Sequence, residues 1–172
     1  MRHFDGNGQL VTISDAISPL SAFGRQAIAA RPGGFTPQGL PEVVNSIEFR
    51  LGPEHAPAQS MRRARGFVAK VLPTLLAGAP NAKVVEDATL AVLTELVDVT
   101  ARHRASLDLS GRVSYDGGHV LITVGEMDRP LPAPEEEPGL FLVRASADCV
   151  GQHREGGGGY ETWASIPVRS AA

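Results

Sequence analysis

Three residues in the stretch TELVDVTARH (94–103) have side chains or spacing that could support chemistry. Glu95, Val99 and His103 follow one another at intervals of four, so on a helix they lie above one another on a single face. A carboxylate and an imidazole are the groups that general acid–base catalysis uses most, but the residue between them is a hydrocarbon. The stretch is therefore either a catalytic helix without its middle polar group or a core helix that carries a Glu and a His.

Both polar residues also have ordinary structural explanations. A buried Glu is costly unless it is paired, and Arg102 or Arg104 at the end of the helix could supply that partner to Glu95. A histidine in the last turn is favoured by the helix dipole. The other four histidines lack the spacing of metal ligands, so the sequence predicts no metal site.

Composition limits the class of protein. A chain of 172 residues with 42% hydrophobic and 20% charged residues is typical of a globular protein with one core. The net charge of -3 lacks the basic footprint of a nucleic-acid-binding protein. The start MRHFDGNGQL lacks the apolar core of an export signal, and no apolar run reaches membrane-spanning length. A single cysteine excludes an internal disulfide, which suits a reducing cytoplasm. Together, these features predict a cytoplasmic protein that binds neither membranes nor nucleic acid.

Hydrophobic periodicity predicts the elements that would position these residues. Residues 46–51 alternate as in a strand. Apolar residues recur at intervals of three and four from Met61 to Leu72, which indicates an amphipathic helix. Pro73 should kink or end it, although Leu75 and Leu76 continue the apolar face for another turn. A second helix, apolar on most sides and therefore central, is expected over 84–103.

The last third of the chain has the pattern of strands. Two alternating runs surround residues 116–118, Asp-Gly-Gly, which is a hairpin signal. A short helix at 139–148 and a pair of strands over 149–168 follow. This order predicts an α+β fold, a two-layer sandwich in which a mostly antiparallel sheet carries helices on one face. We expect this domain to span 46–170, after a flexible N-terminal arm at 1–45 or a segment that becomes ordered on a partner.

The order of these parts resembles the histidine-kinase-like ATPase (GHKL) superfamily with its Bergerat fold, and in particular the small bacterial anti-sigma-factor serine kinases. The resemblance covers residues 46–168 and rests on EFRLGPE…RRARGFV, ELV…ARH, ITVGE, GLFLV and GGGGYETWASI. It implies ATP and Mg²⁺ as cofactors and serine/threonine kinase activity in transcription regulation. The partners that it implies are a sigma factor and an anti-anti-sigma antagonist, with a homodimer as a further option.

The family's helix reads Glu-Leu-Val-x-Asn-Ala-x-x-His. There the Glu orients or deprotonates the attacking group, and the Asn oxygen holds the Mg²⁺ that bridges the phosphates. Glu95 and His103 match this motif, but Val99 stands at the Asn position and has no lone pair for a metal that requires oxygen ligands. Asp98 lies about a quarter-turn away, so only a register shift would bring its carboxylate to the metal.

Two further motifs of the family concern adenine. The Asp-Gly pair at the end of the hairpin strand, which reads the adenine amino group, corresponds to Glu126 and Met127. A carboxylate is retained on a longer stem, whereas the glycine that lets the base approach is replaced by a bulky side chain. The Thr that lies near adenine on the last strand corresponds to Glu161, and a shift of one residue would place Thr162 there instead.

The phosphate site of the family lies at the start of the short helix, where a glycine pair exposes backbone N–H groups. Here Gly139 and Leu140 stand at that position, after Pro138, which has no N–H. Three carboxylates at 135–137 precede them and should repel a triphosphate.

These departures favour a regulatory protein of the anti-sigma type that acts through protein–protein binding, with ATP and Mg²⁺ bound weakly or not at all. Loss of the metal oxygen and of the phosphate glycines together is hard to reconcile with phosphoryl transfer, so the assignment leans away from an enzyme. The alternative is an active ATP-dependent serine/threonine kinase with Glu95 as its base. A second alternative is an unrelated protein-interaction module on the same fold.

Overall fold

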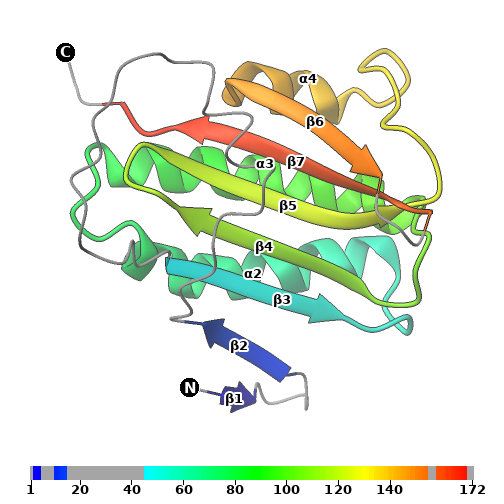
Figure 1. Cartoon of the computed structure of the whole chain (residues 1–172), viewed down its shortest axis with the longest axis horizontal. Coiled ribbons are helices and arrows are strands. Elements are labelled where there is room, and N and C mark those ends of the chain that lie inside the picture. Colours follow the sequence, from blue (N-terminus) through cyan, green and yellow to red (C-terminus); the bar gives the residue numbers. More distant parts are fainter. Residues whose placement is uncertain (1, 5–9, 15–44, 155–157, 170–172) are drawn as a thin grey trace.

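The computed structural model describes residues 2–4, 10–14, 45–154 and 158–169 (Figure 1). They form an α+β fold of two layers, as the sequence predicts. The sheet runs in the order β1-β2-β3-β4-β5-β7-β6, and each neighbouring pair is antiparallel. The strands are β1 (Arg2–Phe4), β2 (Leu10–Ser14), β3 (Asn45–Leu51), β4 (Leu109–Tyr115), β5 (His119–Met127), β6 (Cys149–Arg154) and β7 (Tyr160–Pro167). The helices are α2 (Pro57–Leu75), α3 (Ala82–Arg102) and α4 (Gly139–Ser146).

The three helices cover one face of the sheet, the far face in Figure 1. Helix α3 is central, because it contacts both α2 and α4 as well as strands β5 and β7. Its side chains Leu93, Leu96 and Val97 are fully buried, which explains why its sequence is apolar on most sides. Opposite them, Ile122 and Val124 of β5 are buried from the sheet side, so the core lies between α3 and the middle strands.

The hairpin between β4 and β5 forms at the predicted turn. The carboxylate of Asp116 accepts hydrogen bonds from the backbone N–H groups of Gly118 (2.8 Å) and His119 (2.7 Å). Gly117 has a φ of 94°, a conformation that glycine adopts without a steric penalty. This turn sets the register in which Val113 pairs with Ile122.

Helix α2 continues past Pro73, which was expected to kink or end it. The helix reaches Leu75, with the proline ring exposed on its outer side. Leu72, Leu75 and Leu76 are buried around the proline. We infer that their burial offsets the backbone hydrogen bond that proline cannot donate.

The N-terminal region differs from the expectation at 2–4 and 10–14, where strands are present although no strand was predicted before residue 46. Strand β2 pairs with β3, with Ile13 opposite Ile47, and β1 continues the sheet beyond it. The β-branched run Val11-Thr12-Ile13 suits a strand, but it is too short to stand out from the sequence. The remaining parts of the predicted arm lie outside the described residues. No helix in the described part of the chain is long and apolar enough to cross a membrane.

Candidate functional site

The predicted catalytic face of α3 is turned towards the start of α4. The carboxylate of Glu95 lies so close to Gly139 that a Cβ at position 139 would collide with it. One turn after Val99, the imidazole Nε2 of His103 lies 3.8 Å from Glu137 Oε1. The structure therefore places Glu95 against Gly139 and, two helical turns later, His103 near Glu137.

Glu95 is half-buried, and no other described side chain forms a hydrogen bond or ion pair with it. The suggestion that Arg102 or Arg104 neutralises it is wrong. Arg102 binds Glu137 and Asp98. Arg104 donates instead to the backbone oxygens of His55 (2.8 Å) and Leu107 (3.2 Å).

Val99 is packed in the hydrophobic core. Its side chain is 2% exposed and belongs to the same buried cluster as Met127 and Leu140. Asp98, the nearest alternative oxygen donor on the helix, is bound by Arg102 Nη2 at 3.0 Å, so it is not available through a register shift. Among the described residues no group of three His, Cys, Asp or Glu side chains could hold a metal ion.

Two of the backbone N–H groups at the start of α4 are already used. Leu140 N donates to Glu137 O (2.9 Å) and Phe141 N donates to Pro138 O (3.1 Å). The preceding turn, in which Glu136 and Glu137 both donate to Ala133 O at 3.0 Å, leads directly into the helix. A helix N-terminus binds an anion through free N–H groups, and this one has few to offer.

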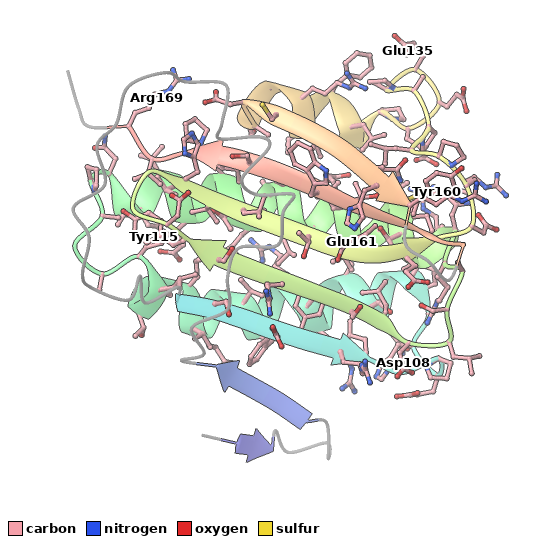
Figure 2. All side chains as sticks on the ribbon, viewed as in Figure 1. Asp108, Tyr115, Glu135, Tyr160, Glu161 and Arg169 are labelled. Carbon is pink, nitrogen blue, oxygen red and sulfur yellow. The ribbon has the colours of Figure 1, made fainter. Side chains whose placement is uncertain are left out.

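One of the three carboxylates at 135–137 is neutralised. Glu137 accepts hydrogen bonds from Arg102 Nη1 at 2.6 Å and from Nη2 at 2.8 Å, one to each oxygen. These bonds hold the pKa of Glu137 below its ordinary value of 4.5, although partial burial acts in the opposite direction. They also raise the pKa of Arg102. The expected repulsion of a triphosphate is thus reduced to Glu135 and Glu136, which are exposed; Figure 2 shows Glu135 at the outer end of this loop.

We call residues 128–138, which join β5 to α4, the strap. It is attached at three points: Asp128 N donates to His103 O (2.8 Å), Leu131 N donates to Gln152 Oε1 (2.5 Å), and Glu137 binds Arg102. The strap is therefore held against the C-terminal end of α3 and against β6.

Where the resemblance predicts adenine contacts, Met127 and Thr162 share one buried space, and both are completely buried. Met127 Sδ lies 3.5 Å from Thr162 Oγ1 and from Gln152 Nε2, and Gln152 Nε2 donates to Thr162 Oγ1 at 2.9 Å. A bulge between Val124 and Met127 changes the register of β5 against β7, so Met127 is buried although the alternation from Val120 to Val124 would bury residue 126. The sequence carries no signal for Gln152, because its partners are distant along the chain.

The two predicted acidic residues of this region lie elsewhere. Glu161 Oε2 lies 3.3 Å from His153 Nε2. It is next to the buried Thr162 in β7, so it projects from the opposite, helix-free face of the sheet, the face turned to the viewer in Figure 2. The carboxylate of Glu126 lies against Gly159. A Cβ added to this glycine would lie 2.7 Å from Glu126 Oε2. Of the two candidates on the last strand, Thr162 is the one that faces the helices.

No protein-family model matches this chain, and a search of curated proteins found no match.

The arrangement offers one predicted base, Glu95. The neighbouring α3 position holds a buried hydrocarbon, and Leu140 N and Phe141 N at the start of α4 are bonded within the preceding turn.

Proposed function

We propose that the chain is a regulatory protein of the anti-sigma type that acts by binding other proteins and binds Mg-ATP weakly or not at all. The observation that carries the proposal is the burial of Val99. Its side chain is 2% exposed in the hydrophobic core and stands where the resembling family places its metal-binding Asn. Magnesium dehydrates only for well-placed oxygen ligands, and a core valine offers none.

The closure of the neighbouring surface supports the same proposal. The strap is tied to α3 through Glu137 and Arg102, and the first amides of α4 are bonded within the preceding turn. A triphosphate would have to break these contacts before it gained any of its own. The free energy needed to break these contacts would weaken the affinity for the triphosphate.

A cationic stripe on α2 supports a protein partner. Arg62, Arg65 and Lys70 are exposed on this helix and form no ion pair with other described residues. Helix α3 differs, because its Lys83 and Arg102 are both paired with acidic side chains. Like charges three or four residues apart cost a helix about 0.2–0.5 kcal/mol per pair, and an acidic partner surface would offset that cost.

The nucleotide part of the proposal is tested by thermal unfolding of the full chain with ATP, with and without Mg²⁺. A ligand at a hundred times its dissociation constant adds about 2.7 kcal/mol to stability. We expect no magnesium-dependent rise in the unfolding temperature at millimolar ATP. A clear rise, or transfer of labelled phosphate to a serine of an anti-anti-sigma antagonist, would instead support the kinase alternative.

The partner part is tested with purified sigma factors and antagonists from the source organism. We expect one of them to bind the wild-type chain, and the double variant Arg62→Glu, Arg65→Glu to lose that binding. The control is Arg50→Glu, to be compared with the single variant Arg62→Glu. It reverses an exposed arginine on the helix-free face of β3, where Arg50 lies 3.8 Å from Asp108. If no sigma factor or antagonist binds the wild-type chain, the anti-sigma assignment fails even if no nucleotide binds.

A further inference from the structure

The two edge strands of the sheet in the described part of the chain differ in length. Beyond β3, the sheet continues through β2 and ends at β1, which has three residues. At the other end the last strand is β6, which has six residues and an unbroken register with β7. Proteins protect sheet edges with very short strands, prolines, lysines or bulges. Strand β1 is short in this sense, whereas β6 has none of these protections.

Apolar side chains are exposed beside the β6 edge. Helix α4 contacts β6 and lies along it at the upper margin of the sheet in Figure 1. Phe141 and Leu142 of this helix are 54% and 41% exposed. They account for two of the four exposed large hydrophobic side chains in the described part of the chain. An open strand edge with apolar neighbours is the arrangement that binds an extended peptide as an added strand.

The charged side chains beside β6 indicate which kind of segment could bind along this strand. Arg144 of α4 and Arg154 of β6 are both exposed and form no ion pair with other described residues; Arg154 lies over the ring of Tyr160 at 5.6 Å. The intervening acid, Asp148, is bound by Arg169 at 3.0 Å. Arg144 and Arg154 are thus the exposed cations that α4 and β6 present without an acidic partner among the described residues, in a chain whose net charge is -3.

We propose that β6 is a docking edge for an extended, acidic segment of a partner protein, which adds to the sheet as a strand beside β6. Its backbone would pair with β6, its apolar side chains would contact Phe141 and Leu142, and its carboxylates would meet Arg144 and Arg154. A second copy of this chain suits the edge less well, because pairing β6 with itself would gather the arginines of both copies at one seam. The inference concerns a surface separate from α2 and from Glu95, so it holds whether or not the proposed function is correct.

The experiment uses the full wild-type chain and a short fluorescein-labelled peptide, observed by fluorescence anisotropy. Every second residue of the peptide is by turns glutamate and valine, with serine between them, so that both side chains point to the face of the sheet that carries α4. We expect binding that weakens with salt, and no binding of the same peptide with lysine in place of glutamate. The double variant Arg144→Glu, Arg154→Glu should bind about tenfold more weakly. The matched control is Arg62→Glu, Arg65→Glu on α2, which makes the same charge change away from the edge and should bind as the wild type does.

Strand addition is separated from nonspecific charge attraction by backbone N-methylation of the peptide. A strand bonds to β6 along only one of its two edges. Of two peptides methylated at alternate sets of amides, one should therefore lose binding and the other should keep it. The bound peptide should also slow alkylation of Cys149, the single cysteine of the chain, which is exposed on β6.

Three outcomes would overturn the proposal. Equal binding of both methylated peptides would show that no strand forms. Loss of binding in the α2 control would move the site to α2. A dimer in sedimentation experiments without peptide, with Cys149 protected within it, would assign the edge to a second copy of the chain.

Discussion

The substitution Val99→Asn restores the amide that the resembling family uses to hold magnesium, and it separates the structural role of this position from a catalytic one. Val99 is 2% exposed, within the core cluster. Removing a buried valine forfeits about 1.5 kcal/mol of hydrophobic burial, and an amide without partners costs about 1–3 kcal/mol more. We therefore expect the free energy of unfolding to fall by about 3 kcal/mol.

This loss should be measurable without unfolding the protein outright. Domains of this kind have unfolding free energies of about 5–15 kcal/mol, and each kcal/mol corresponds to roughly 2–4 °C in Tm for chains of about this size. The Tm of Val99→Asn should thus drop by roughly 6–12 °C. Val99→Thr is the control, because it keeps the β-branched shape and its hydroxyl can bond to the preceding helical turn. It should lose about 1 kcal/mol.

The assay is urea unfolding of wild type and both variants, each with and without Mg-ATP. We expect the nucleotide to restore no stability to Val99→Asn, because the first amides of α4 are bonded within their own turn and the strap is tied to Arg102. Recovery of about 2.7 kcal/mol or more, dependent on magnesium, would show that a working phosphate site remains. An undiminished stability without nucleotide would refute the placement of Val99 in the core.

Three further predictions concern the contacts around the strap. Glu137→Gln should lower stability by up to about 1 kcal/mol, since this ion pair is partly exposed. The folded protein lowers the pKa of Glu137, so the ion pair stabilises it only while Glu137 is ionised. The stability difference between variant and wild type in urea unfolding should therefore be full above pH 4.5 and disappear as the pH falls below that value. Gly139→Ala should destabilise the wild type but be nearly neutral in a Glu95→Ala background. A double-mutant cycle by calorimetry would measure this difference. An equal loss of stability in both backgrounds would contradict the contact between Glu95 and Gly139. Gln152→Ala removes the acceptor of Leu131 N and should speed limited proteolysis within the strap, whereas an unchanged cleavage rate would mean that this bond does not hold it.

The elements that periodicity encodes could be predicted from the sequence. The apolar pattern of α3 and the Asp-Gly-Gly turn after β4 both depend on residues close together in the chain, and both elements formed where expected. The α2 prediction placed too much weight on Pro73. Leu75 and Leu76 continue the apolar face beyond the proline in the sequence, and both are buried.

Contacts between distant residues could not be predicted in the same way. Arg102 had several acidic candidates, and its choice of Glu137, 35 residues away, depends on how the strap folds back onto α3. Gln152 was missed for the same reason, since it bonds to Leu131 and Thr162 from an edge strand with no clear alternation. The bulge in β5, which sets the side of the sheet that Met127 faces, likewise depends on the pairing with β7.

The position of Glu95 gives this carboxylate a structural reason to persist without catalysis. It is half-buried and has no partner among the other described side chains, yet it lies against Gly139, the first residue of α4. A negative charge at a helix N-terminus is stabilised by the helix dipole, by about 0.3–1 kcal/mol at exposed sites. The Glu95 carboxylate is thus placed where the dipole of α4 favours a negative charge. A carboxylate in this role would also oppose the approach of a phosphate, so its presence in the ELV…ARH motif is as consistent with a closed site as with a catalytic base.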